Sequence, residues 1–150
     1  MANQAIASVG TVLSVSNSIP ATINAAGFTA LSYTVVSEAA EVPEFGAEQA
    51  LVTFTPLQTG VVEKRGGSVD YGEVTIPLAD SLDAGSAILE AKTNLAVTAD
   101  KRVSVRVVTP NGVSRYFLAS VRSFRANIGG SDAIVMASTI LAITSPVFKV

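Results

Sequence analysis

"KRVSVRVVTPNGVSRYFLASVRSF", residues Lys101 to Phe124, is the stretch of the sequence that indicates the fold most directly. Three valines alternate with polar residues in its first half, which is the period-two pattern of a strand with one buried face. The tripeptide at 110–112 supplies turn residues, and the extended pattern resumes at Arg115. The stretch therefore predicts a β-hairpin.

The rest of the chain has the composition of a β protein. Hydrophobic residues make up 49% of the 150 residues, and most are small or β-branched and interleaved with Ser and Thr. The patterns predict further strands at Thr29–Val36, Ala50–Thr55, Val69–Leu78 and Ile134–Thr144. A helix is predicted over Asp83–Thr93, with candidate caps at Asp80, Ser81 and Asp83 and an apolar stripe of Ala84, Ile88, Leu89 and Ala91. We expect one mainly β domain over 1–150, a sandwich or barrel with one short α-helix and a long inter-strand loop.

The strand predicted at Ile134–Thr144 carries apolar side chains on both faces. Met136 and Ile140 fall on one face, and the other face holds Val135, Leu141 and Ile143. Other parts of the protein cover both faces of a strand of this kind. We expect the domain's own core on one side and a neighbouring subunit on the other.

The chain contains neither cysteine nor histidine. Disulfides, Ser-His-Asp triads, Cys-His pairs and the usual zinc sites are therefore excluded, and we predict no enzyme activity, no cofactor and no metal. The pair Asp70 and Glu73 is the remaining acid–base candidate. Strand alternation would place these carboxylates on opposite faces, where they could not share a substrate.

No targeting or membrane segment is predicted. The N-terminus has no basic side chain before its weakly apolar run, unlike a secretory signal. The apolar stretch Ala133–Phe148 is interrupted by Ser, Thr and Pro and is shorter than the roughly 20 residues of a membrane span. We expect synthesis in the cytoplasm and no insertion into a membrane.

A long polar connection, "TPLQTGVVEKRGGSVDYG" (Thr55–Gly72), separates two predicted strands. Its Lys64-Arg65 pair precedes Gly66-Gly67 and no helix follows, so it lacks the order of a phosphate-binding loop. It is longer than ordinary hairpin loops. We predict an arm over 55–68 that folds against a neighbour; the alternative is a mobile surface loop with no partner.

Charge is distributed unevenly along the chain. The first 37 residues carry none, an acidic cluster follows at Glu38, Glu41, Glu44 and Glu48, and the last fifty residues hold seven basic side chains against Asp132. Either the two groups pair within one fold, or an acidic face of one subunit meets a basic face of the next.

Two runs of the sequence resemble the major tail tube proteins of long, non-contractile-tailed bacteriophages. They are "PATINAAGFTALSYTVVSEAAEVPEFG" (Pro20–Gly46) and "TPLQTGVVEKRGGSVDYGEVTIPLADSLDAGSAIL" (Thr55–Leu89). The resemblance implies a structural protein of the virion tail, assembled in the host cytoplasm. It implies stacked hexameric rings around a channel through which phage DNA passes without specific binding, with tape measure and tail terminator or tip proteins as partners.

The resemblance also indicates which segments contact neighbours. In that family the connection between the two strands reaches toward an adjacent ring, and the N-terminal segment, here 1–20, and the acidic loop tend to contact other subunits. Our interface candidates are Glu38, Glu41, Glu44, Phe45, Glu63, Lys64, Arg65, Arg102, Arg106, Arg115, Arg122 and Arg125. Because bare arginines would retard DNA, we predict that the five arginines after residue 101 sit at seams or on the exterior. We expect them to pair with Glu38, Glu41, Glu44 or Glu63.

Two other readings stay open. Tube proteins of contractile tails and secretion machines use similar subunits, and sequence patterns do not separate them. The other is a free-standing β-sandwich that binds a sugar or protein. Such modules display aromatic platforms, whereas this chain has no tryptophan and its tyrosines, Tyr33, Tyr71 and Tyr116, are dispersed.

Overall fold

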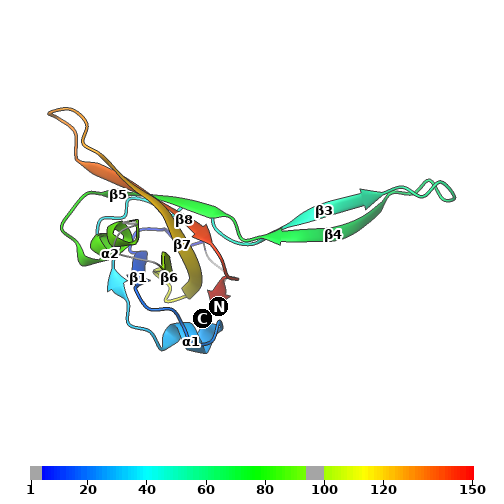
Figure 1. The fold of residues 1–150 in the computed structure, drawn as a ribbon, viewed down its shortest axis with the longest axis horizontal. Helices are drawn as coiled ribbons and strands as arrows, with labels where there is room; N and C mark the ends of the chain where they lie inside the picture. The colour runs from blue at the N-terminus through cyan, green and yellow to red at the C-terminus, as the bar shows by residue number, and fades with distance from the viewer. Residues whose placement is uncertain (1–4, 94–99) are drawn as a thin grey trace.

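Antiparallel strands dominate the computed structural model, which describes residues 5–93 and 100–150 (Figure 1). The main sheet has seven strands in the order β2-β1-β6-β7-β8-β5, with β9 paired to β7. Its strands are β1 (Val12–Ser16), β2 (Thr34–Val35), β5 (Glu73–Ala79), β6 (Arg102–Val108), β7 (Ser114–Asn127), β8 (Met136–Ile143) and β9 (Phe148–Lys149). A separate two-stranded sheet consists of β3 (Glu48–Phe54) and β4 (Glu63–Asp70). The predicted mainly β fold is confirmed.

The two edges of the main sheet are joined by the segment that follows β2. Ala39 bridges Leu78 of β5. The Ala40 N–H donates to the Pro77 carbonyl at 2.9 Å, and the Ala79 N–H donates to the Glu38 carbonyl at 2.9 Å. Pro77 has no N–H to donate back to the Ala40 carbonyl, so this pair carries a single bond. The sheet is therefore nearly closed into a barrel, one of the two predicted alternatives.

The barrel interior is the hydrophobic core. Alternate residues of each strand point inward, as in β8, where Ala137, Thr139, Leu141 and Ile143 are buried and the intervening residues are half-buried. The main buried cluster comprises Leu13, Val15, Val36, Val74, Ile76, Leu89, Val103, Val105, Val107, Phe117, Ala119, Val121, Leu141 and Ile143. Both faces of β8 were predicted to be covered, and the chain's own core covers one of them. Coverage of the Met136–Ile140 face by a neighbour stays a prediction.

A second, smaller cluster lies on the outside of β7. Phe28, Tyr116 and Leu118 are buried there, with the Phe28 ring 6.2 Å from that of Tyr116 and 5.7 Å from that of Phe148. Phe28 belongs to α1 (Ala25–Thr29), whose N-cap Asn24 accepts a hydrogen bond from the Gly27 N–H. The predicted strand Thr29–Val36 was therefore largely wrong, since Thr29 ends a helix and only 34–35 pair.

The predicted helix is α2 (Ala84–Lys92), and Asp83 is its N-cap. Partial burial raises the pKa of Asp83. Hydrogen bonds from the Ser37 hydroxyl and from backbone N–H groups outweigh this effect, so the pKa lies below its ordinary value. The predicted stripe needs correction. Leu89 is buried and Ile88 half-buried, but Ala84 and Ala91 are exposed, and the buried face is completed by Gly85, Ser86 and Lys92.

Gly85 has a specific role on that face of α2. A side chain there would meet the Val35 carbonyl oxygen at 2.6 Å, so only glycine lets the helix approach β2 this closely.

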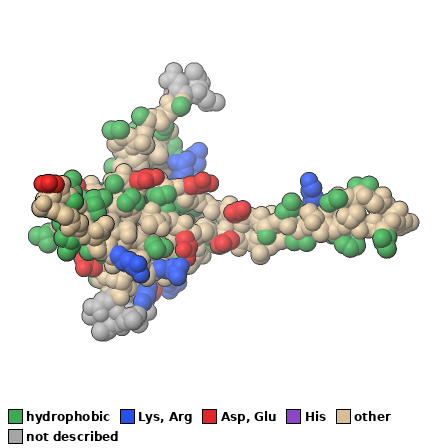
Figure 2. Space-filling model, turned by 90° about the horizontal axis from the view of Figure 1, so that it is seen from above, with side chains coloured by type: hydrophobic (Ala, Val, Ile, Leu, Met, Phe, Trp, Pro, Cys, Tyr) green, Lys and Arg blue, Asp and Glu red, His purple; other side chains and the backbone are tan. Residues whose placement is uncertain are grey.

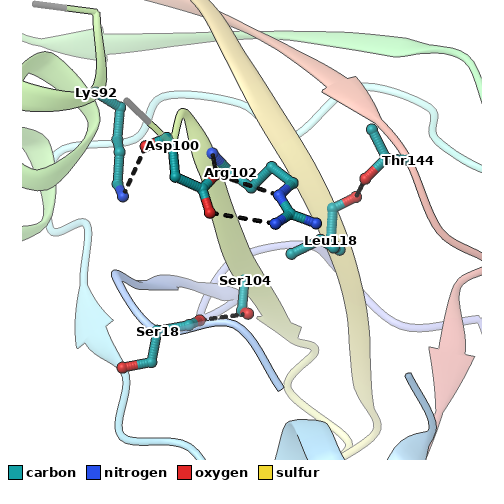
Figure 3. A network of polar contacts seen from close by, with 7 residues as sticks. All are labelled: Ser18, Lys92, Asp100, Arg102, Ser104, Leu118 and Thr144. Carbon is teal, nitrogen blue, oxygen red and sulfur yellow. Dashed lines mark hydrogen bonds and ion pairs between the residues drawn. The ribbon is translucent and has the colours of Figure 1, made fainter. Parts of the chain in front are cut away.

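The hairpin predicted over 101–124 is confirmed. β6 pairs with β7 from Arg102↔Ser120 to Val108↔Ser114, and Gly112 adopts φ +85° in the turn. Hydrogen bonds from side-chain hydroxyls to backbone carbonyls connect this hairpin to neighbouring segments (Figure 3). The Ser104 hydroxyl donates to the Ser18 carbonyl at 2.8 Å, and the Thr144 hydroxyl donates to the Leu118 carbonyl at 3.2 Å.

Two other expectations differ from the structure. Part of the segment 1–20, expected as an N-terminal arm, is β1, whose Leu13 and Val15 lie in the core. The predicted strand Val69–Leu78 is two strands, because Tyr71 and Gly72 break it between β4 and β5.

Candidate assembly interface: the arm and the groove

The β3–β4 hairpin, with the loop 55–62 at its tip, projects from the barrel as an arm (Figure 1). Its strands pair from Glu48↔Asp70 to Phe54↔Glu63. Every residue of both strands is exposed except Gly67, which is half-buried. The arm was predicted as a loop over 55–68. The arm also includes the strand predicted at Ala50–Thr55, which is β3, and β4 begins at Glu63 inside the predicted loop.

Large apolar side chains lie along the arm in solvent. Leu51 is 64% exposed, Phe54 65%, Leu57 104% and Val61 64%, and Figure 2 shows apolar side chains on both visible edges of the arm out to its tip. An isolated two-stranded ribbon is only marginally stable in water. The arm therefore has the composition of a segment that becomes covered by another molecule.

The Gly66-Gly67 pair has a structural explanation in the arm. A side chain at Gly67 would meet the Val52 Cγ2 at 2.9 Å and the Ala50 carbonyl oxygen at 3.2 Å, whereas one at Gly66 would meet only the movable end of the Gln49 side chain. The strand register shifts between Gln49 and Leu51, so Gly67 accommodates a bulge in the facing strand. Lys64 and Arg65 thus lie on a strand, where no helix N-terminus is available for a phosphate.

A tight turn fixes the base of the arm on the barrel. Gly72 adopts φ +79° and its N–H donates to the Asp70 carboxylate at 2.9 Å. The Gly72 carbonyl then accepts from the Ile143 N–H of β8 at 3.0 Å. Because only glycine adopts this φ without strain, Gly72 sets the direction in which the arm leaves.

A groove of about 930 Å³ lies between the segment 8–13 and the loop 39–45. Its apolar lining includes Val9, Val12 and Val42. Glu41 and Glu44 line the groove and so does Arg115, yet none of the three forms an ion pair with a described residue. The groove therefore combines apolar surface with uncompensated charges of both signs.

Phe45 also lines the groove, and it packs on the chain's own core. Its ring lies 5.2 Å from that of Phe117 and its side chain is half-buried. The Phe45 side chain is therefore already packed within the single chain. A contact with a neighbour would use its remaining exposed surface.

Two of the five arginines are paired within the chain, with partners that the sequence analysis did not assign. Arg102 lies 3.1 Å from the carboxylate of Asp100, and Arg122 forms an ion pair with Glu73. Hydrogen bonds from Arg102 hold the pKa of Asp100 below its ordinary value. The Asp100 carbonyl also accepts from the Lys92 ammonium at 3.2 Å (Figure 3). Expecting only the acidic loop or Glu63 as partners was therefore wrong for these two side chains.

Arg106 lies over the Tyr33 ring, 4.8 Å from its centre, and its guanidinium donates to the Ser14 hydroxyl at 3.4 Å. Burial, with a contribution from nearby Tyr116, raises the pKa of Tyr33 to about 12 despite the opposing effect of Arg106. Tyr33 is thus neutral at pH 7 and donates to the Phe28 carbonyl at 2.9 Å. The Arg106 charge is balanced by a cation–π contact and by no carboxylate of the described residues.

The remaining candidates divide between the arm and the body. On the arm, Glu63 and Arg65 lie 3.6 Å apart, and Lys64 points to the opposite face. Glu38 and Arg125 are exposed on the body without an ion pair to a described residue. Whether any of these side chains pairs between subunits stays a prediction.

The described residues give no sign of a metal centre or a membrane span. No three of their acidic side chains are grouped as a metal ion requires. No helix in 5–93 or 100–150 has the length and apolar character needed to cross a bilayer.

Comparison with known proteins identifies the fold. No protein-family model and no curated protein matches the sequence. A chain in the cryo-EM structure of the anti-feeding prophage (AFP) baseplate matches with a TM-score of 0.70 and 8% identity, over 100% of this chain and 97% of that chain. A chain in the cryo-EM structure of an extracellular contractile injection system, the PVC sheath/tube terminator in the extended state, matches with a TM-score of 0.69 and 10% identity. That match covers 100% of this chain and 99% of the other.

The chain therefore has the fold of tail-associated proteins from phage-tail-like injection particles. The second of these structures is described as an extracellular contractile injection system.

Proposed function

We propose that this chain is a structural subunit of a phage-tail-like particle and that copies of it assemble around a central channel. The single observation that carries the proposal is the arm. Its two strands expose apolar side chains on both faces, and none of the residues in 5–93 or 100–150 forms a layer that covers them. Copies of the same subunit would supply that cover.

The extent of the structural match supports the proposal. The likeness spans the whole chain and nearly the whole of each matched chain. The nearly closed sheet of the body leaves few unpaired strand edges at which copies could aggregate. The arm, in contrast, has two free strand edges that can pair with other copies. This division of roles suits a subunit that must fold alone and then polymerise.

The matching structures favour the tube or an adjacent tail layer of a contractile particle. A second candidate is the tube of a non-contractile phage tail, through which DNA leaves and in which tape measure and terminator proteins are partners. The observation in its favour is the resemblance of the runs Pro20–Gly46 and Thr55–Leu89. A sheath protein that binds along the outside of the assembled particle distinguishes the first candidate from the second.

Negative-stain electron microscopy of the purified protein tests the proposal. We expect rings or tubes with an axial hole. A control variant in which residues 50–68 are replaced by Asn-Gly should keep the folded barrel and lose these particles, because it lacks the apolar arm surface. Solitary particles at every concentration, with the arm folded back on the body, contradict the proposal, and sugar binding by such a monomer would favour a binding module.

A further inference from the structure

Apolar residues at the tip of the arm are followed directly by charged residues. Its apolar end includes Leu57, Val61 and Val62, which are 104%, 64% and 52% exposed. Glu63, Lys64 and Arg65 follow directly and carry one negative and two positive charges. A partner surface should therefore be apolar at its centre and bear the opposite balance of charge at its edge.

The groove on the barrel has this composition. Its lining includes the apolar residues Val9, Val12 and Val42 together with two carboxylates, Glu41 and Glu44, and one guanidinium, Arg115. None of the three is neutralised by an ion pair with a described residue. Arg115 also lies directly across from Lys149 on β9, and two like charges in this position repel. A carboxylate from another molecule would relieve that repulsion.

A chain cannot place its own arm tip in its own groove. β3 has seven residues, so at about 3.4 Å per residue the tip lies about 24 Å from the arm base. The arm extends away from the barrel along its whole length (Figure 1). The tip and the groove can meet only between two copies.

We propose that the groove receives the arm tip of a second copy, with the apolar tip in the groove. Lys64 on one face of the ribbon and Glu63 and Arg65 on the other face then bring their charges to Glu41, Glu44 and Arg115 of the groove lining. This inference rests on the proposed function and names its contact. The tip and the groove are different surfaces of one molecule, so the contact is heterologous and each copy retains a free arm and a free groove for further growth. Rings and stacks follow from repeating one contact.

Engineered cysteines test the contact, since the chain has no cysteine of its own. Leu57→Cys is mixed with Val9→Cys, in which the substituted groove residue is 87% exposed. The control mixes Leu57→Cys with Leu82→Cys; Leu82 is 106% exposed and is not among the residues that line the groove. A disulfide needs the two Cα atoms within about 7 Å. We expect several-fold more mixed disulfide with Val9→Cys than with Leu82→Cys.

Charge reversal supplies the second measurement. Lys64→Glu with Arg65→Glu should reduce particle yield at least several-fold, and Glu41→Lys with Glu44→Lys in the same chain should restore it. Equal disulfide yields for both cysteine pairs, or no restoration, would overturn the groove assignment while visible rings or tubes leave the proposed function intact. Absence of rings and tubes from the unmodified protein, in contrast, would contradict the proposed function itself.

Discussion

Replacing Leu57 by serine separates folding from assembly. The Leu57 side chain is 104% exposed in the single chain, so its loss should change the free energy of unfolding by no more than about 0.5 kcal/mol. In the assembled particle the same side chain becomes buried. Burial of a leucine contributes about 1.5–3 kcal/mol, and serine forfeits most of this contribution.

The expected effect is therefore about 2 kcal/mol per contact, which corresponds to roughly a 30-fold weaker association. The concentration at which particles form, measured by sedimentation, should rise by a similar factor, while chemical denaturation of the monomer should give an unchanged midpoint. Leu82→Ser is the matched control, because Leu82 is as exposed but lies outside the arm. If both variants shift the assembly concentration equally, the reasoning about the arm is refuted.

Three further predictions concern the body. Phe45→Ala should lower the free energy of unfolding by roughly 2 kcal/mol by denaturant titration, because the half-buried ring packs on Phe117; an unchanged value would assign Phe45 to assembly alone. Asp83→Ala should cost about 1 kcal/mol at pH 7 through loss of the helix cap. Because the folded pKa of Asp83 is lowered, its stabilisation is complete above the ordinary pKa near 3.8 and is lost as pH falls through the folded value. Thermal scans should thus show wild type and variant converging below about pH 4, and a pH-independent gap would contradict the assigned cap. Arg122→Ala should cost less than about 1 kcal/mol, because its ion pair with Glu73 is exposed, and a larger loss in the same scans would show a structural role for the pair.

Local sequence patterns predicted the elements whose stabilising contacts are local. The β6–β7 hairpin combines strict alternation with a turn, and both signals lie within one short stretch. Asp83 marked the start of α2 because a helix cap acts within three residues of itself. By contrast, α1 spans five residues, and a helix of little more than one turn shows no period.

The elements that were missed depend on contacts distant in the sequence. β1 was not expected, because Ser14 and Ser16 on its outer face look polar although the fold buries them. The arm was placed correctly as a projection but read as a loop from Thr55 onward, since Gly66 and Gly67 weaken a strand pattern whose facing bulge lies in β3. The groove could not be predicted at all. It is formed where the segment 8–13, the loop 39–45 and Arg115 meet in space.

The most direct test of the central claim is hydrogen exchange of the arm amides, residues 48–70, in dispersed and in assembled protein. The account predicts rapid exchange in the dispersed chain, where the ribbon has no covering layer, and strong protection after assembly, with β6 and β7 protected in both states. Arm amides that exchange equally fast in both states would show that the arm stays uncovered, and would contradict the account.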